Sequence, residues 1–419
     1  MIPKSSDSSS RIEIIDALRG SALLGILLVH SVEHFDFMRY PRNPPAWLQT
    51  LNLQARDAAF FLFGGKAYAI FALMFGLSFF LILDRAARRG VNFRWRFLWR
   101  LAVLAIIGFL HSLVYCGDIL GILAVLGIPL VFLYSASDRV LGWLSALLVL
   151  QLPTLWQLGR IVFESGYAPA VSHYGPYYRE LSQVFANQGL LDVLKVNVWH
   201  GALARGWWTI DTGRYLQMMG LFVWGLMLGR SRVFENPEAY ARLAKKILGF
   251  GIAGFVVLYP LKFTVGTWGL TGMRLRVSDG LLASYCDLAQ MFIWAGGFVL
   301  LYEFTRVRVA LRLLIPYGRM SLTCYVTQAL VGVPLFYNFG FGLYRQLGQF
   351  YSILGGAVFF VLQCALAHLW LKRFQYGPLE WLWRCATLLS FDTPFRNRAT
   401  VPSGAKAETG RSAETQPAT

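Results

Sequence analysis

Residues 18–30, "LRGSALLGILLVH", form an apolar run with Arg19 near its start and His30 at its end. The run is typical of a helix that is apolar enough to enter a bilayer. Eleven positions separate the two ionisable side chains, so on a helix they lie about 20° apart around the axis and about 16 Å apart along it. They therefore share one face of the segment, with one ionisable group near each end.

Similar apolar runs recur along the whole chain. Of its 419 residues, 56% are hydrophobic and only 15% are charged, and the mean hydropathy is +0.49. A soluble protein of this size needs a larger charged fraction to cover its surface. The pattern predicts an all-α polytopic membrane protein with about ten transmembrane helices. The expected spans are residues 14–32, 60–83, 97–115, 118–135, 139–158, 214–230, 244–263, 281–303, 316–336 and 354–372.

The basic residues gather in alternate connections between these spans. Residues 84–100, 230–246 and 305–312 are rich in Arg and Lys, whereas connections such as 337–352 carry little positive charge. The positive-inside rule therefore predicts a multi-pass protein with both termini cytoplasmic. The net charge of +17 is explained by these loops. We accordingly expect the lipid bilayer as a partner and no nucleic acid, and the sequence does not determine the oligomeric state.

The sequence predicts one transmembrane domain, residues 13–390, between a disordered N-terminus, residues 1–12, and a disordered tail, residues 391–419. Its longest outside loop, residues 159–213, is too polar to span a bilayer but is rich in Trp and Tyr. An interfacial helix is expected at 179–200. This loop is either a simple lid or a segment that contacts substrate.

The spacing of Arg19 and His30 recurs in the third expected span as Arg100 and His111. Odd-numbered spans run in the same direction, so the two histidines should lie at a similar depth. Asp118 follows His111 at the start of the next span. Two imidazoles and a carboxylate are thus predicted to converge, as a general base requires, and all three are candidate catalytic residues. The competing interpretation is that each Arg and His merely lies at its own membrane interface.

Three cations are candidates for binding an anionic donor. Arg19 and Arg319 are expected at the cytoplasmic end, where guanidinium groups suit phosphates. Lys66 lies inside the second expected span and could bind a phosphate or thioester oxygen. Alternatively, Lys66 extends to the interface or pairs with Asp287 of the eighth span.

Three further polar residues are candidates for binding substrate. Arg19, Leu23, Ile26 and His30 line one stripe of the first span, which either Glu33 or His34 continues. Gln328 lies near the middle of the ninth span. The four-residue spacing of His30 and His34 also suits zinc, but no "HExxH" string is present, and we expect no metal. The five cysteines show no paired spacing. Gly225 and Gly229 form a small-residue step that predicts close helix packing.

Five segments spread from residue 11 to residue 384 resemble the YeiB-like family, which carries domain of unknown function 418. They are "DALRGSALLGILLVH", "GKAYAIFALMFGLSF", "FLWRLAVLAIIGFLHSLVYCGDIL", "GRMSLTCYVTQALVGVPLFYNFGFGL" and "YGPLEWLWR". That family is similar to a wider superfamily of transmembrane acyltransferases, whose acyltransferase family 3 members share an Arg-x10-His pattern in the first span. Arg19 and His30 match this pattern, although many YeiB-like chains have Asn at the position of His30.

The resemblance implies an acyl-CoA-dependent O- or N-acyltransferase. It implies a protein of the bacterial inner membrane in which a cytosolic acyl-CoA gives its acyl group to a hydroxyl or amine acceptor. The acceptor is a small molecule, glycan or lipid at or beyond the outer face. Arg19 and Arg319 would hold the donor phosphates, and His30, oriented by Asp118 or His111, would deprotonate the acceptor. A secondary transporter or a lipid or metabolite flippase is the alternative, because it too places polar groups inside the membrane. An assembly or scaffold protein without turnover is a third interpretation.

Overall fold

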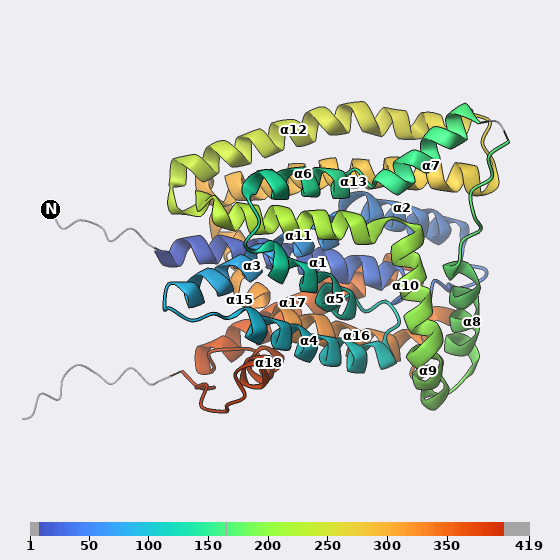
Figure 1. Ribbon diagram of the computed structural model, residues 1–419. Coiled ribbons are helices and arrows are strands. Elements are labelled where there is room, and N and C mark those ends of the chain that lie inside the picture. Colours follow the sequence, from blue (N-terminus) through green and yellow to red (C-terminus); the bar gives the residue numbers. More distant parts are fainter. Residues whose placement is uncertain (1–7, 165, 398–419) are drawn as a thin grey trace, which may run out of the picture.

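The computed structural model describes residues 8–164 and 166–397, and these residues form a bundle of α-helices (Figure 1). Extended pairing within them is limited to an isolated bridge between Phe374 and Arg396. The helices are α1 (Ser8–Val32), α2 (Ala46–Leu62), α3 (Lys66–Ala87), α4 (Arg94–Val114), α5 (Leu120–Leu133), α6 (Asp138–Val149), α7 (Leu152–Phe163), α8 (Tyr174–Asn187), α9 (Leu190–Val196), α10 (Ala202–Asp211), α11 (Arg214–Arg230), α12 (Pro237–Thr264), α13 (Gly272–Phe304), α14 (Arg308–Leu311), α15 (Leu314–Arg319), α16 (Ser321–Phe336), α17 (Gln349–Arg373) and α18 (Pro378–Leu388). The predicted all-α class is confirmed.

The helices have the length and composition of membrane spans. Among the described residues, six helical segments are long and apolar enough to cross a bilayer: α1, α2 with α3, α4, α12, α13 and α17. A seventh is added if α6 and α7, which are bent by 43° at their junction, count as one span. Helices α5 and α16 are apolar but shorter. Every span expected from the sequence falls on one of these helices or on α11, so the chain is a multi-pass helical membrane protein.

Helix α1 lies inside the bundle and α12 lies at its edge. In the most apolar window of α1, 67% of residues are buried within the protein, whereas in α12 only 6% are. Helix α1 packs against α3, α15 and α17, and α12 runs along the outer side of α13 (Figure 1). Small residues make the central position of α1 feasible, because Ala17 and Ala22 are fully buried.

Helices α3 and α11 make a very close contact. A Cβ atom on Gly225 would lie 2.1 Å from the carbonyl oxygen of Leu73, and one on Gly229 would lie 2.4 Å from the ring of Phe80. Neither position has room for a side chain. The predicted packing role of this small-residue step is confirmed.

The two ends of the bundle differ. The connections from α3 to α4 and from α11 to α12, both rich in Arg, lie at the end where α1 begins, and α18 lies there too (Figure 1). Helices α8, α9 and α10 lie across the opposite end, where α1 ends (Figure 1). The segment 159–213, expected to be a loop with a helix at 179–200, is mostly helical. The single helix expected at 179–200 is divided among α8, α9 and a short π-helix, Asn197–Gly201. The segment is ordered because apolar side chains such as Leu181 and Phe185 are buried against the bundle.

The chain remains ordered beyond the expected boundary at residue 390. The Gln375 N–H donates to the Phe395 carbonyl oxygen at 2.9 Å, and the Asn397 N–H donates to the Arg373 carbonyl oxygen at 3.0 Å. The Phe395 ring also packs on Trp381, with 4.8 Å between ring centroids. Residues 391–397 therefore fold back onto the end of α17. Residues 1–7 and 398–419, which hold most of the two predicted disordered ends, lie outside the described residues.

Candidate functional site

A cavity of about 860 Å³ lies at the end of the bundle that α8 and α10 cover. Its walls come from the last turn of α1, the turn after it, the junction of α2 and α3, the connection from α4 to α5, and the start of α11. Except for Tyr325 of α16, all of its lining residues lie between Ile26 and Met218 in the sequence. A volume of this size suits a small-molecule ligand.

His30 lines this cavity beside a buried pair formed by His111 and Asp118. The Nδ1 atom of His111 and Oδ1 of Asp118 are 2.8 Å apart, and the side chains are almost fully buried. The second carboxylate oxygen of Asp118 accepts the Gly121 N–H at 3.0 Å, and Asp118 itself lines the cavity. A carboxylate in this position fixes the tautomer of the imidazole, so Nδ1 of His111 carries the proton and Nε2 is an acceptor.

Two tyrosine rings connect the two histidines. The Tyr115 ring centroid lies 5.2 Å from that of His30 and 5.8 Å from that of His111. The corresponding distances from Tyr325 are 6.3 Å and 5.3 Å. Nε2 of His111 is buried and has no hydrogen-bond partner in the described part of the chain. The structure thus places His30, His111 and Asp118 at one level, as the sequence analysis expected.

An unusual turn after α1 brings two carboxyl groups into the cavity. His34, Phe35 and Asp36 have φ angles of 52°, 56° and 64°, which are left-handed values that residues other than glycine seldom adopt. Glu33 and Asp36 line the cavity as a result. Burial raises the pKa of Asp36 to about 6, although the Tyr115 hydroxyl and Arg205 favour its ionised form. Burial and the nearby Asp36 also hold the pKa of Glu33 well above its usual range.

The same turn directs His34 away from the cavity. Its Nε2 lies 2.8 Å from the Ser352 hydroxyl, its Nδ1 lies 2.7 Å from the Arg39 carbonyl oxygen, and its ring stacks on Phe336 at 4.1 Å. Burial lowers the pKa of His34 to about 4, so the ring is neutral at physiological pH. These contacts join the end of α1 to α16 and α17.

Arginines also line the cavity. Arg205 of α10 donates from Nη1 to the Cys116 carbonyl oxygen at 2.9 Å. Arg214, the first residue of α11, donates to the Tyr68 hydroxyl, which in turn donates to Oε1 of Gln217 at 2.6 Å. Arg205, Arg214 and Tyr68 all line the cavity.

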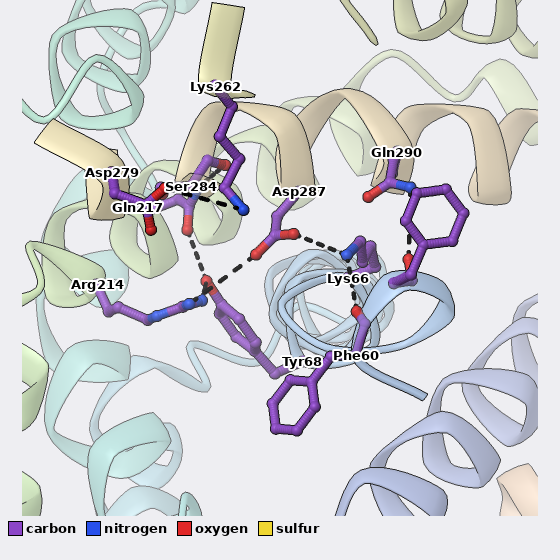
Figure 2. Close-up of polar contacts among 11 residues, drawn as sticks. Phe60, Lys66, Tyr68, Arg214, Gln217, Lys262, Asp279, Ser284, Asp287 and Gln290 are labelled. Atoms are coloured by element: carbon purple, nitrogen blue, oxygen red, sulfur yellow. Dashed lines mark hydrogen bonds and ion pairs between the residues drawn. The ribbon is translucent and has the colours of Figure 1, made fainter. Parts of the chain in front are cut away.

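A buried ion pair between Lys66 and Asp287 lies next to Arg214 (Figure 2). Nζ of Lys66 lies 2.7 Å from Oδ1 of Asp287 and donates to the Phe60 carbonyl oxygen at 3.1 Å. The other carboxylate oxygen of Asp287 lies 4.0 Å from Arg214. Gly65 makes this approach feasible: its φ is +78°, and a Cβ atom there would lie 1.8 Å from Asp287 Oδ2. Helices α3, α11 and α13 are thereby joined through charges.

Comparison with known proteins relates this chain to one protein family. Residues 228–390 match the family described as protein of unknown function (DUF418). Protein YxaH of Bacillus subtilis (strain 168) is 28% identical over 411 residues, covering 92% of this chain and 96% of its own length. A 39.9 kDa protein from the amylase 3′ region of Bacillus acidopullulyticus is 27% identical over 90% of this chain and 94% of its own. Protein YeiB of Escherichia coli (strain K12) is 27% identical over 89% and 95%.

The family match and these relatives support a place for the chain among the YeiB-like DUF418 proteins. All three relatives are described as uncharacterized proteins, so they assign no reaction to the cavity. Its chemistry has to be inferred from the residues that line it.

Three predicted cations of this YeiB-like protein lie outside the cavity lining that the described residues form. Arg19 contacts Asp16 and the Ser78 hydroxyl, each at 2.9 Å, near the middle of α1. Arg319 donates to the Gln375 carbonyl oxygen at 3.3 Å. Lys66 is held by its pair with Asp287, which was the alternative kept open in the sequence analysis. Along the face of α1 that carries His30 and Arg19, the cavity extends as far as Ile26. Leu23, which lies between Ile26 and Arg19 on this face, is fully buried.

The three candidate substrate-binding residues are also separated. Glu33 lines the cavity, whereas His34 points away from it. Gln328 is buried within the bundle and donates to the Tyr317 hydroxyl at 2.8 Å. The part of the YeiB-like chain that the structure describes contains no group of three or more His, Cys, Asp or Glu side chains placed to hold a metal ion.

The sequence analysis missed Asp36, Tyr68, Arg205 and Arg214 of the cavity. Arg205 belongs to the stretch "WHGALARGWW", which was included in the outside loop, and Arg214 directly follows that loop. The available signal was the mixture of arginine with tryptophan in a polar segment. A charged residue there costs little if it faces water, so composition alone did not distinguish a wall of a cavity from a surface.

Proposed function

We propose that this protein is an acyltransferase of the bacterial inner membrane that acylates a hydroxyl or amine acceptor bound in the cavity. A cytosolic acyl-CoA is the donor. The observation that carries the proposal is the position of His30, which faces the cavity beside the buried pair of His111 and Asp118. A neutral imidazole next to a ligand-sized space has a ring nitrogen that can accept a proton from an acceptor.

In the proposed reaction His30 removes the proton from the acceptor hydroxyl or amine. The acceptor atom then attacks the thioester carbonyl carbon, a C–O or C–N bond forms and the C–S bond breaks. The CoA thiolate leaves and takes up the proton held by His30, so the products are acylated acceptor and CoA. Glu33 contacts the acceptor from the wall of the same cavity. His111 and Asp118 act as positioning residues through the Tyr115 and Tyr325 rings.

The donor side of the proposal requires a conformational change. We propose about ten crossings with both termini cytoplasmic, which places Arg19 and Arg319 at the donor end. Arg19 lies about 16 Å from His30 by helix rise, a separation that a pantetheine arm can cover. Leu23 is fully buried between Arg19 and His30, so the proposal includes its displacement when acyl-CoA binds.

Two variants test the two halves of this proposal separately. His30→Ala should lower acyl transfer by about 10²–10⁴-fold and leave CoA binding unchanged. His368→Ala is the matched control, because His368 is exposed on α17. Transfer that survives the loss of His30 would contradict its assignment as the base.

Arg19→Ala should weaken CoA binding by at least about tenfold, since a charge-assisted contact to phosphate is lost. Arg373→Ala is the control, because Arg373 is an exposed cation in the last turn of α17. The measurement is calorimetric titration of CoA into protein in detergent. If the wild-type protein does not bind CoA at millimolar concentration, the acyl-CoA mechanism must be abandoned.

One observation favours a transporter or flippase as the second candidate. The chain breaks between α2 and α3, and Phe63, Gly64 and Gly65 at this break line the cavity. Interrupted helices beside a ligand site are a feature of secondary transporters. Vesicles containing the purified protein distinguish the two functions: a transporter moves its solute without acyl-CoA and without covalent change, whereas the enzyme consumes acyl-CoA and modifies the acceptor.

A further inference from the structure

The buried cluster of charged residues next to the cavity has more cations than carboxylates. In the cluster of Lys66, Arg214 and Asp287, two cations share one carboxylate (Figure 2). Lys66 is the direct partner at 2.7 Å, whereas Arg214 is 4.0 Å away. The next carboxylate shown, Asp279, lies 4.0 Å from Lys262 (Figure 2). Asp287 therefore compensates only part of the charge of Arg214, and the Arg214 guanidinium lines the cavity.

Arg205 adds a second incompletely paired guanidinium to the same wall. Its Nη1 group donates to the Cys116 carbonyl oxygen, which is a neutral acceptor. No carboxylate of the described residues lies within ion-pair distance of Arg205. A guanidinium has five N–H donors, so this contact leaves most of its donors available to a ligand. The N-terminus of α11, which begins at Arg214, adds the positive end of a helix dipole at this wall.

The two carboxyl groups that line the cavity do not cancel this positive charge fully. Burial and the nearby Asp36 hold the pKa of Glu33 well above its usual range, which favours its neutral form. Asp36, with a pKa of about 6, is mostly ionised at pH 7.5 and is hydrogen-bonded to Tyr115. The reduction of negative charge therefore comes from Glu33, and two guanidinium groups share the cavity with Asp36 as the mainly ionised carboxylate.

We propose that Arg205 and Arg214 form an anion subsite that binds a phosphate group of the ligand. Two guanidinium groups that line one cavity from successive helices can bind the oxygen atoms of a phosphate. The cavity volume of about 860 Å³ leaves room for an organic portion beside the phosphate. Taken with the proposed function, on which this last step rests, the acceptor is a phosphate-bearing molecule whose hydroxyl or amine reaches His30. The phosphate belongs either to a lipid headgroup or to a water-soluble phosphate ester.

The first test uses inorganic phosphate and the intact protein in detergent at pH 7.5. Phosphate should raise the melting temperature of the wild-type protein above that in chloride of equal ionic strength. Arg205→Gln and Arg214→Gln should each weaken phosphate binding by about tenfold or more. Arg276→Gln is the matched control, because Arg276 is exposed on α13 outside this cavity, and it should leave binding unchanged.

A second arm identifies the source of the phosphate. The protein is reconstituted in phosphatidylcholine nanodiscs with or without phosphatidylglycerol, and bound lipid is counted by native mass spectrometry. Phosphatidylglycerol retained by the wild type and lost in Arg205→Gln supports a lipid headgroup. Binding of inorganic phosphate without lipid retention supports a soluble ester. If neither probe binds, or if Arg205→Gln and Arg276→Gln behave alike, the subsite is refuted.

The subsite and the proposed reaction can fail independently. His30→Ala should abolish transfer but leave phosphate binding intact, because it removes no guanidinium. Phosphate binding by a protein that transfers no acyl group would overturn the proposed function and retain the subsite. Since Arg214→Gln also disturbs the buried cluster, the wild-type melting shift and the Arg205 variant test the subsite without relying on it.

Discussion

Replacing Asp287 by Asn tests whether the buried charge cluster stabilises the bundle. The Lys66 side chain is only 5% exposed and that of Asp287 is 18% exposed, with 2.7 Å between nitrogen and oxygen. At an effective dielectric constant of about 20, a pair at 2.7 Å interacts by about 6 kcal/mol, against which the desolvation of both groups must be set. Removing one partner of a buried pair typically costs about 3–5 kcal/mol, because the other charge stays buried. We expect Asp287→Asn to lower the free energy of unfolding by that amount.

The geometry makes a stricter prediction about the partners. Because Lys66 and Arg214 share one carboxylate, Asp287→Asn leaves two cations without a counter-ion. Lys66→Met leaves Asp287 with Arg214, so it should cost clearly less. The double variant Lys66→Met/Asp287→Asn should be more stable than Asp287→Asn alone, since one of the uncompensated cations is removed.

Reversible unfolding in mixed micelles measures these differences. Asp57→Asn is the control, because the pair of Arg56 and Asp57 is exposed, 44% and 68%, and its loss should cost at most about 1 kcal/mol. The reasoning is refuted if Lys66→Met destabilises as much as Asp287→Asn, or if Asp287→Asn changes stability no more than the control does.

Three other variants address packing, capping and pH. Gly225→Val should prevent the close contact of α11 with the Leu73 carbonyl oxygen and give little folded protein, measured as the monodisperse fraction in size-exclusion chromatography; normal yield would contradict the 2.1 Å approach. Glu380→Ala should cost about 1–2 kcal/mol in the same unfolding assay, because Glu380 accepts hydrogen bonds from the N–H and the hydroxyl of Thr323 at the start of α16, and Glu380→Gln should cost less. Sulfate binding should strengthen by about tenfold as the pH falls from about 7.5 to about 5.5, because protonation of Asp36 near pH 6 removes a negative charge facing the anion subsite. Asp36→Asn should bind sulfate tightly at both pH values, and an unchanged pH dependence in that variant would assign the effect to another group.

The helices and part of the site were predictable because they follow from periodicity. Apolar runs indicated where helices lie, and the Arg-x10-His spacing in two parallel spans was enough to place His30 and His111 at one level with Asp118. These inferences need only helix geometry and a bilayer thickness. They do not need the identity of neighbouring helices.

The remainder of the site depends on contacts between distant parts of the chain. Nothing local to Lys66 indicates that Asp287, far along the sequence, lies 2.7 Å away. The left-handed turn that brings Asp36 into the cavity is held by tertiary packing, since residues other than glycine rarely adopt it unaided. Arg205 lies on a short helix whose composition resembles a surface loop. These features depend on the three-dimensional arrangement of segments that are distant in the sequence.

The cavity draws its lining almost entirely from the first half of the chain, with Tyr325 as the exception. The segment that matches DUF418, residues 228–390, therefore supplies the scaffold and the buried counter-ion Asp287, but hardly any of the surface that a ligand touches. Two proteins can share this segment closely and still bind different molecules. Ligand preference across such proteins should be sorted by the residues corresponding to His30, Arg205 and Arg214, and exchanging the halves of two homologues should transfer ligand choice with the amino-terminal half.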